Sequence, residues 1–339
     1  MKTIVLEEPG SFRRTDTPEP EAAAAGQAVV LVRRIGICGT DLHAFRGRQP
    51  FFSYPRILGH ELGVEVLDVG PGVEGVEVGS HYAVEPYLHC GTCPPCRQGR
   101  TNCCAQLQVL GVHADGGMRE RIVVPAEKLH GSKDLQLEQL ALVETLGIGA
   151  HAVERAALQK GEAVLVIGAG PIGLATVQFA QVAGARVAVM EVDPHRLEFC
   201  CAQFSVERGI AGGGEGLDQV RDWLGGELPS TVFDATGNAA SMQGAFEYVE
   251  SGGQLVFVGF QQGDISFSNP EFHRREMTLK SSRNSVADDF RRIIRLMEEG
   301  QVDTRPWISH RADYGDMVER FEGWLEPEEQ VVKVVVDFD

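Results

Sequence analysis

The chain has 339 residues, a formal net charge of −17 at pH 7 and 43% hydrophobic residues. This length is large for one hydrophobic core, so we expect two domains. The acidic balance argues against nucleic acid and anionic membranes as partners, because both need a basic surface. No positively charged start leads into an apolar segment, and no apolar run approaches the roughly 20 residues of a membrane helix. We therefore expect a cytoplasmic protein.

Approximately the first 150 residues are predicted to be rich in β-structure. Short apolar runs at 1–6, 28–32 and 122–124 are typical of strands, and glycine-containing turns at 70–72 and 115–117 separate such runs. This pattern indicates a β-rich domain.

Residues 36–43, Gly-Ile-Cys-Gly-Thr-Asp-Leu-His, combine a thiol, a hydroxyl and an imidazole in a short stretch. The thiolate of Cys38 would be a strong zinc ligand. The hydroxyl of Thr40, followed by the imidazole of His43, could pass a proton outward. Taken alone, the stretch fits a buried structural cysteine beside a capping threonine equally well.

Five cysteines are clustered in the sequence, at Cys90, Cys93, Cys96, Cys103 and Cys104. In a reducing compartment such a cluster more often binds metal than forms disulfides. Four thiolates in a lobe at about 88–106 predict a tetrahedral zinc site. Such a site is structural, because it leaves no coordination position for a substrate. One of the two adjacent cysteines must be left out of it.

From about residue 150 the pattern changes to alternating strands and helices. The wholly apolar run 163–167 is typical of a parallel strand that is covered on both faces. Asp193 and Pro194 predict an N-cap and the first position of a helix. Cys200 and Cys201 lie in this predicted helix and are expected to pack there. Other elements are predicted at 172–182 (helix) and at 186–190, 231–235, 254–258 and 277–280 (strands). The pattern predicts a doubly wound α/β unit, followed by a tail with one or two helices and a last strand at 331–336.

The turn Gly168-Ala169-Gly170-Pro171-Ile172-Gly173 directly follows the strand 163–167 and opens a helix. Gly168 would permit the tight turn, Gly170 would let a pyrophosphate approach the backbone, and Gly173 would allow close packing of helix and strand. The helix that begins at Pro171 and Ile172 would offer free N–H groups to the phosphates. A helix-packing turn without a nucleotide is the alternative.

An acidic residue, Glu191, stands at the end of the second strand, 18 residues after Gly173. Its carboxylate could accept both ribose hydroxyls of adenosine and would repel a 2′-phosphate, so we expect NAD rather than NADP. Arg196 could instead serve a 2′-phosphate; beside Glu191 we expect it to cover the adenine or to contact a phosphate. The predicted cofactor site is completed by residues that follow the next strands, Thr236, Val258 and Gly259.

Together these motifs resemble the zinc-containing medium-chain alcohol and polyol dehydrogenase family over essentially the whole chain. Residues 36–43 resemble its first catalytic-zinc segment and Gly59-His60-Glu61 its second, and the cysteine lobe and glycine turn follow in the family's order. The resemblance implies an α/β fold with a GroES-like catalytic domain (1–149 and 282–339) and a Rossmann NAD-binding domain (150–281). It also selects Cys104 as the fourth ligand of the structural zinc.

The resemblance further implies a catalytic zinc held by Cys38 and His60. Glu61 would be a direct or exchangeable ligand. Glu144 would be a ligand or a water-mediated partner at the place where classical alcohol dehydrogenases supply a cysteine, which is the pattern of the polyol and threonine dehydrogenase branch. Two positions depart from the family pattern: Thr145, where the branch usually has proline, and Val64, where the segment usually has a second glycine.

The implied chemistry is oxidation of an alcohol. A zinc ion with an open position lowers the pKa of the substrate hydroxyl, and hydride passes to the nicotinamide of the cofactor. The proton would leave through Thr40 and then His43, by way of a cofactor ribose hydroxyl.

The substrate is expected to be a small hydroxylated molecule, either a sugar acid or a polyol. The stretches 46–51, 111–117 and 282–284 resemble the sugar-acid 5-dehydrogenases that act on L-galactonate or L-gulonate. Candidate partners for a substrate carboxylate are Arg46, Arg48, Arg119 and Arg283, because arginine binds carboxylates through two hydrogen bonds. Each of them could equally be a solvated surface charge. We expect a homodimer or homotetramer. The alternatives are an L-threonine 3-dehydrogenase-like enzyme, a general alcohol dehydrogenase, and a zinc-stabilised nucleotide-binding protein without catalytic metal.

Overall fold

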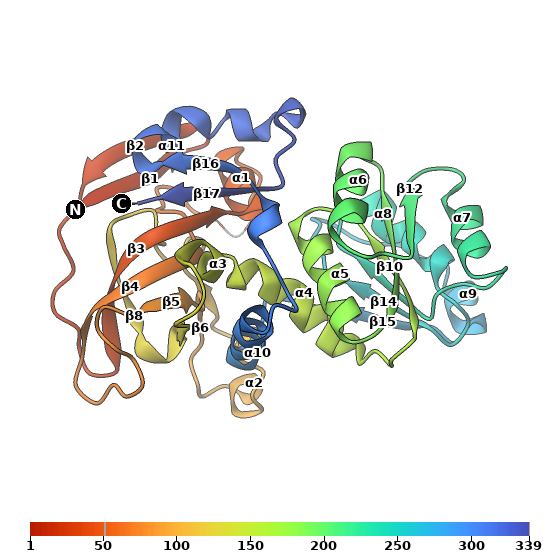
Figure 1. Ribbon diagram of the computed structural model, residues 1–339, viewed down its shortest axis with the longest axis horizontal. Helices are drawn as coiled ribbons and strands as arrows, with labels where there is room; N and C mark the ends of the chain where they lie inside the picture. Colours follow the sequence, from red (N-terminus) through yellow and green to blue (C-terminus); the bar gives the residue numbers. More distant parts are fainter. Residues whose placement is uncertain (51, 339) are drawn as a thin grey trace. The chain divides into compact units, whose positions relative to one another are not determined.

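A computed structural model describes residues 1–50 and 52–338; Phe51, at the end of the stretch 46–51, and Asp339 lie outside the described residues. The chain forms two compact units (Figure 1), one of residues 1–145 and 285 onward and the other of residues 146–284. These units are defined by compactness alone. The domain limits expected from the sequence concern parts that fold independently, and they remain a prediction. Each helix in the described part of the chain is too short or too polar to cross a membrane.

The first unit is built around a seven-stranded sheet. Its strand order is β16-β17-β3-β4-β5-β9, and β8 pairs with β3 outside this path. The strands are β3 (Gln27–Ile37), β4 (Glu61–Val69), β5 (His81–Val84), β8 (Arg121–Pro125), β9 (Leu129–Gly131), β16 (Ile308–Asp313) and β17 (Lys333–Asp337). The strands predicted at 28–32, 122–124 and 331–336 are thereby confirmed in type, with shifted ends.

Strand β3 is the hub of this sheet, because β4, β8 and β17 all pair with it antiparallel. It continues past the predicted apolar run through two arginines. Arg33 forms an ion pair with Glu65 of β4 at 2.8 Å, and Arg34 forms one with Asp337 of β17 at 2.7 Å. Since cross-strand carboxylates pair these charges, the strand extends to Ile37 despite its polar centre.

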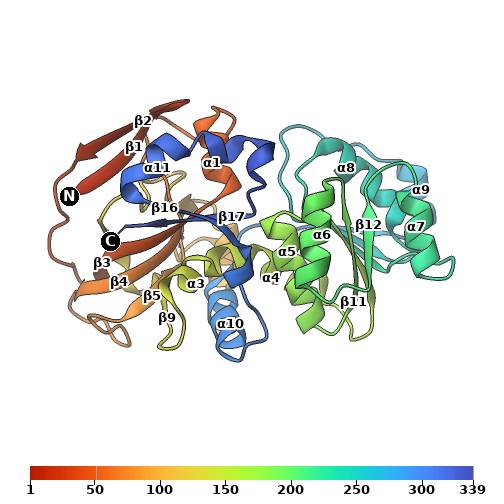
Figure 2. The same cartoon turned by 45° about the horizontal axis from the view of Figure 1, so that its top comes forward.

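Shorter elements surround the sheet. The strands are β1 (Lys2–Glu8), β2 (Ser11–Asp16), β6 (Tyr87–Leu88) and β7 (Gln108–Val109). The helices are α1 (Gly39–Phe45), α2 (Pro94–Arg97), α3 (Leu137–Ala141), α10 (Ala287–Glu298) and α11 (Tyr314–Arg320). Helix α4 (Val143–Ala156) begins in this unit, at the end of its first segment. Helix α11 packs beside β16 (Figure 2). Helices α10 and α11 are the helices predicted in the tail.

The unusual Val64 is accommodated in the core of this sheet. Its side chain is fully buried, together with Val30, Ile35 and Leu62. The preceding residue, Gly63, is the position that must lack a side chain, because a Cβ there would lie 2.1 Å from the carbonyl oxygen of Leu137. The close approach of backbone to backbone therefore occurs one position earlier than the family pattern suggests.

The second unit is a six-stranded parallel sheet in the order β12-β11-β10-β13-β14-β15. The strands are β10 (Ala163–Ile167), β11 (Arg186–Glu191), β12 (Arg208–Ala211), β13 (Thr231–Asp234), β14 (Gln254–Phe257) and β15 (Thr278–Ser281), and the helices are α5 (Pro171–Val182), α6 (Pro194–Gln203), α7 (Gly216–Trp223), α8 (Ala239–Gly244) and α9 (Asn269–Arg274). Helix α5 packs on β10 and β11, and α6 on β11 and β12 (Figure 1). The carboxyl ends of β10 and β13 lie next to each other where the strand order reverses, which is where doubly wound folds bind ligands.

The predicted start of α6 is confirmed. The side chain of Asp193 accepts hydrogen bonds from the backbone N–H groups of His195 (2.9 Å) and Arg196 (3.3 Å), so it is an N-cap. In the same helix Cys200 is buried and Cys201 is exposed. Cys200 therefore packs in the core, and Cys201 packs at the surface, where a Cβ at Gly209 would lie 2.6 Å from its Sγ.

Candidate active site

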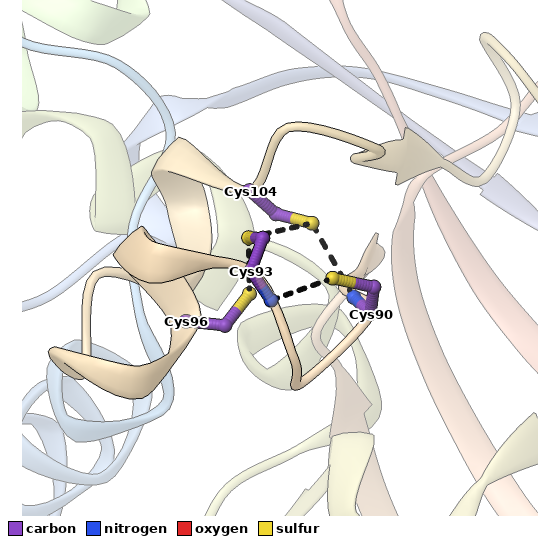
Figure 3. A group of neighbouring side chains, drawn as sticks. All are labelled: Cys90, Cys93, Cys96 and Cys104. Atoms are coloured by element: carbon purple, nitrogen blue, oxygen red, sulfur yellow. Dashed lines mark hydrogen bonds between the residues drawn. The ribbon is translucent and has the colours of Figure 1, made fainter.

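The Sγ atoms of four cysteines converge in the first unit. One ligand atom from each of Cys90, Cys93, Cys96 and Cys104 lies within 4.8 Å of the others (Figure 3). The sulfur of Cys93 is 3.3 Å from that of Cys96 and 3.9 Å from that of Cys104. Sulfurs about 2.3 Å from a tetrahedral zinc are about 3.8 Å apart. The cluster therefore has the size and chemistry for one zinc ion with no position left open.

Local donors stabilise the thiolates of this cluster. The hydroxyl of Thr92 lies 3.6 Å from Cys90 Sγ, and the Cys93 N–H donates to the same sulfur at 3.4 Å; together they lower the pKa of Cys90 to about 5. The Cys90 N–H donates to Cys104 Sγ at 3.3 Å. Cys103 is exposed at the surface, so of the two adjacent cysteines the structure groups Cys104 with the other three.

A second cluster contains Cys38, His60 and Glu61, each with a ligand atom within 4.8 Å of the other two. Cys38 follows the end of β3, and Glu61 begins β4. The antiparallel pairing of these strands sets Gly36 opposite Glu61 and so brings the two segments together. One sulfur, one imidazole and one carboxylate are a ligand set for zinc that leaves a fourth position open, as catalytic sites require.

The charge around His60 also suits a cation. Burial lowers the pKa of His60, but the negative charges of Asp41 and Cys38 outweigh this effect and raise it well above its usual value. Asp41 Oδ1 lies 3.7 Å from His60 Nδ1, while Asp41 Oδ2 accepts a hydrogen bond from the Cys38 N–H at 2.9 Å. At 3.7 Å the two atoms do not form a hydrogen bond, so Asp41 acts on His60 through its charge.

Glu61 is fully buried and is paired with Lys333 of β17. The Lys333 Nζ lies 2.7 and 2.9 Å from the two carboxylate oxygens of Glu61, and it also donates to the Ile37 carbonyl at 3.3 Å. Gly36 makes room for this carboxylate, because a Cβ there would lie 2.0 Å from Glu61 Oε2. Burial raises the pKa of Glu61, but Lys333 outweighs it and holds the pKa below its usual value. Glu61 is therefore kept ionised beside the ligand cluster.

Glu144 is buried in the first turn of α4 and is not a member of the three-residue cluster. Its Oε1 accepts a hydrogen bond from the phenol of Tyr87. Burial, reinforced by the charge of Glu61, raises the pKa of Glu144. Thr145 is the third residue of α4, a position where proline and threonine both allow a helix to start. The departure from proline therefore leaves the backbone around Glu144 helical.

Thr40 and His43 are three residues apart on α1 and so share one face of this helix. Thr40 is half-buried and His43 reaches the surface. Burial lowers the pKa of His43, and the charges of Arg46 and Arg48 lower it further. The imidazole of His43 therefore loses its proton more readily than a free histidine, and it lies on the helix that starts directly after Cys38.

In the second unit the glycine turn has the geometry that its sequence predicts. Gly168 has a φ of +99°, and a Cβ at Gly173 would lie 1.8 Å from the Gly168 carbonyl oxygen. Gly170 caps α5, with Pro171 at the first position and Ile172 next. At Gly170 a Cβ would find its nearest neighbour, Arg196 Nη1, only at 3.8 Å, so the backbone there is open to a phosphate group.

Glu191, at the end of β11, is tied to this turn. Its Oε2 accepts a hydrogen bond from the Ala169 N–H at 2.7 Å, and its Oε1 accepts from Val192 at 2.7 Å and Asp193 at 3.0 Å. A carboxylate has about four acceptor positions. Because three of these are used, accepting both ribose hydroxyls would require one backbone bond to be released.

The other predicted cofactor residues follow the carboxyl ends of β13 and β14. The Thr236 hydroxyl donates to Asp234 Oδ1 at 2.7 Å. Val258 is buried, and a Cβ at Gly259 would lie 2.3 Å from the Gly237 nitrogen. These residues lie at the same sheet edge as the glycine turn, because β10, β13 and β14 are parallel neighbours.

The candidate substrate arginines differ in their surroundings. Arg46 Nη2 donates to the Leu325 carbonyl at 3.0 Å, and Arg119 Nε donates to the Gly116 carbonyl at 3.1 Å. These backbone contacts compete with the binding of a substrate carboxylate. Arg48 and Arg283 have exposed side chains.

Three further residues of the site were not identified from the sequence: Asp41, Tyr87 and Lys333. Asp41 lies within the 36–43 motif, and its short spacing to Cys38 was the available signal. Lys333 is a charged residue at the start of a valine strand, which is unusual for a buried element. The sequence around Tyr87 does not indicate a role for it, because its partner Glu144 lies 57 residues further along the chain.

A closed four-sulfur metal cluster, an open cysteine–histidine–carboxylate cluster and a glycine turn at the reversal of a parallel sheet define a zinc- and nucleotide-dependent dehydrogenase. Family models agree with this class. Residues 24–134 match the alcohol dehydrogenase GroES-like domain, and residues 171–299 match the zinc-binding dehydrogenase model.

The chain is also similar to individual proteins over its whole length. It is 38% identical to L-galactonate-5-dehydrogenase of Escherichia coli K12, covering 100% of this chain and 99% of that protein. It is 32% identical to 2-dehydro-3-deoxy-L-galactonate 5-dehydrogenase of Pseudoalteromonas atlantica, over 88% of each. The crystal structure of RspB from E. coli CFT073 with NADH has a TM-score of 0.93 at 30% identity, covering 100% of this chain and 99% of that one. The chain therefore belongs to the zinc-containing medium-chain alcohol and polyol dehydrogenase family, as its motifs predict, and is an NAD- and zinc-dependent oxidoreductase.

The Cys38→Ser variant tests the second cluster. We expect it to fall from about two zinc ions per chain to about one, because the four-cysteine cluster is untouched. Turnover should be lost while the melting temperature changes little. Metal analysis and steady-state assays measure both effects.

The matched control is Cys201→Ser, which changes an exposed thiol in α6 and should keep both metals and full activity. A Cys38→Ser protein that retained its activity and both zinc ions would contradict the assignment of Cys38 as a ligand.

Proposed function

We propose that this enzyme oxidises a secondary alcohol of a sugar acid or polyol and transfers the hydride to NAD. The observation that carries the proposal is the full-length similarity to L-galactonate-5-dehydrogenase. Glu144, at the place where alcohol dehydrogenases of the classical type have a cysteine, supports the polyol branch. The family assignment leaves the non-enzymatic interpretation without support.

In this proposal Cys38 and His60 hold the catalytic zinc, with Glu61 as an exchangeable ligand and Glu144 as an outer partner. A zinc ion at this place lowers the pKa of a substrate hydroxyl. Thr40 takes the released proton and His43 delivers it to solvent, because the two residues follow each other outward along α1. Cys90, Cys93, Cys96 and Cys104 hold the structural zinc.

The cofactor is proposed to bind with its pyrophosphate on the first turn of α5, where Gly170 leaves the backbone open. Glu191 would contact the adenosine ribose and disfavour a 2′-phosphate, and Arg196, half-exposed above the glycine turn, would contact a phosphate or the adenine. Thr236, Val258 and Gly259 would line the nicotinamide half, since they follow neighbouring strands. Arg46, Arg48, Arg119 and Arg283 are the candidates for a substrate carboxylate.

We also propose that the chain assembles as a homodimer or homotetramer in the cytoplasm. Strand β15 ends the sheet of the second unit and leaves Leu279 36% exposed, so a second copy could extend the sheet there. Zinc sites built from thiolates require reducing conditions, which the cytoplasm provides.

A substrate panel tests the proposed activity. The holoenzyme would be assayed for NADH formation with L-galactonate, L-gulonate, L-arabinitol, sorbitol, L-threonine and ethanol, each with NAD and with NADP. We expect the highest kcat/KM on an aldonate, with neutral polyols weaker and NAD preferred over NADP.

Highest activity on L-threonine would favour a threonine 3-dehydrogenase instead, and activity confined to ethanol would favour a general alcohol dehydrogenase. Either result contradicts the proposed substrate class. Heat-inactivated enzyme is the control for reduction of NAD that does not depend on catalysis.

The proposed proton path predicts a pH effect of Arg46→Gln. Arg46 lowers the pKa of His43, so its removal raises that pKa toward the ordinary value. His43 must be neutral to accept a proton, and the acid limb of the kcat profile should therefore move to higher pH. Measuring kcat across the pH range checks this shift.

Arg221→Gln is the matched control, because it removes the same charge from α7 of the second unit and should leave the acid limb in place. If Arg46→Gln instead raised the KM for aldonates with an unchanged acid limb, Arg46 would be a substrate residue and the proposed influence on His43 would be wrong.

A further inference from the structure

Tyr87 has two buried polar neighbours beside the metal cluster, Glu144 and Ser285. Its side chain is 2% exposed, and its hydroxyl donates to Oε1 of Glu144, which is itself 5% exposed. Burial and the negative charge of Glu144 raise the pKa of Tyr87 well above its usual value, so the phenol keeps its proton and acts as the donor. The contact is therefore a hydrogen bond from a neutral phenol to a buried carboxyl group.

The ring of Tyr87 is fixed by packing on α10. It meets Phe290 edge to face, with ring centroids 6.5 Å apart. Phe290 in turn lies against the ring of His130 at 5.0 Å. His130 is held by Glu85, whose two carboxylate oxygens lie 3.1 Å from His130 Nε2 and 2.5 Å from the Nζ of Lys128. The ring of Tyr87 therefore packs on buried side chains whose charged members, Glu85 and Lys128, are paired with each other.

The backbone of Tyr87 is fixed by the four-cysteine lobe. Strand β6 runs into the lobe and β7 leaves it, and their pairing sets Tyr87 opposite Val109. Cys90 follows Tyr87 by three residues, and its N–H donates to Cys104 Sγ at 3.3 Å. Because both strands are joined to this cluster, the lobe limits how far Tyr87 can move.

The hydrogen bond from Tyr87 matters because Glu144 is a buried carboxylate. A buried carboxylate needs a partner, and losing its hydrogen bond costs free energy unless another donor or a cation replaces it. Glu144 is close enough to His60 and Glu61 for their charges to change its pKa. Without the phenol, a metal ion at Cys38 and His60 competes with the buried hydroxyl of Ser285 as the replacement partner.

We propose that Tyr87 is a positioning residue that holds Glu144 outside the inner ligand set of the catalytic zinc. Its hydroxyl thereby keeps one coordination position free for a substrate hydroxyl. The inference extends the proposed function, because it assigns a role to Tyr87 at the same site. Lys333 gives the complementary contact, since it holds Glu61 within the ligand cluster.

The test uses Tyr87→Phe, which removes only the hydroxyl, with Co²⁺ replacing zinc at the catalytic site. We expect both metal sites to stay filled and the melting temperature to change little. The visible d–d bands of cobalt should change in position and intensity, because a carboxylate oxygen then occupies the position that was open. Turnover should fall about tenfold or more, because the position for the substrate is taken, while the KM for NAD stays unchanged.

The double variant Tyr87→Phe, Glu144→Gln is the decisive comparison. A neutral amide is a much weaker ligand than a carboxylate, so the cobalt bands should return toward those of the unmodified protein. Tyr82→Phe is the matched control, because Tyr82 is also buried and its hydroxyl accepts a hydrogen bond from the Glu77 N–H at 2.9 Å. It should leave the cobalt spectrum unchanged.

An unchanged cobalt spectrum in Tyr87→Phe would overturn the inference, whatever happens to activity. Loss of zinc from the four-cysteine cluster would also overturn it, since Tyr87 would then serve only the lobe. The cobalt spectrum does not depend on the substrate. Failure of the substrate panel on the unmodified enzyme would therefore contradict the proposed function without deciding the role of Tyr87.

Discussion

The buried ion pair between Glu61 and Lys333 is the contact on which the catalytic cluster depends. It joins β4 to β17 across β3, where Gly36 leaves space for the carboxylate. Removing one partner of such a pair typically costs about 3–5 kcal/mol, whereas replacing both by apolar residues is often neutral. Stability alone does not explain its presence. Its use is to fix an ionised carboxylate beside Cys38 and His60.

The cluster concentrates negative charge, and this charge explains its other contacts. Glu61 and Glu144 can both be anionic, while Lys333 supplies one positive charge and a zinc ion would supply two. Each carboxylate has its own buried donor, an ammonium group for Glu61 and the phenol of Tyr87 for Glu144. The charged donor, Lys333, lowers the pKa of Glu61 and so favours its ionised form. The neutral donor, Tyr87, does not outweigh the effect of burial, so the pKa of Glu144 stays raised. The two carboxylates are therefore not equivalent, although both are buried.

Local motifs could be predicted from the sequence, because neighbouring residues make them. The cysteine spacing indicated the four-sulfur cluster, and the apolar run before Gly168 indicated the parallel strand and its turn. Contacts between distant segments were not predictable in this way, and Lys333 reaches Glu61 across 272 residues. The short strand β12 was missed because it has four residues, and these include a charged residue and a glycine. The three backbone donors already bound to Glu191 could not be anticipated either, since they depend on how the turn closes.

The central claim is that the chain holds two zinc ions in two different ligand sets. Anomalous diffraction from crystals of the holoenzyme at the zinc absorption edge measures this directly. We expect one peak about 2.3 Å from the four sulfurs of the lobe and a second peak within about 2.0–2.3 Å of Cys38 Sγ and a His60 nitrogen. A single peak in the lobe, with none between Cys38 and His60 in zinc-replete active enzyme, would contradict it.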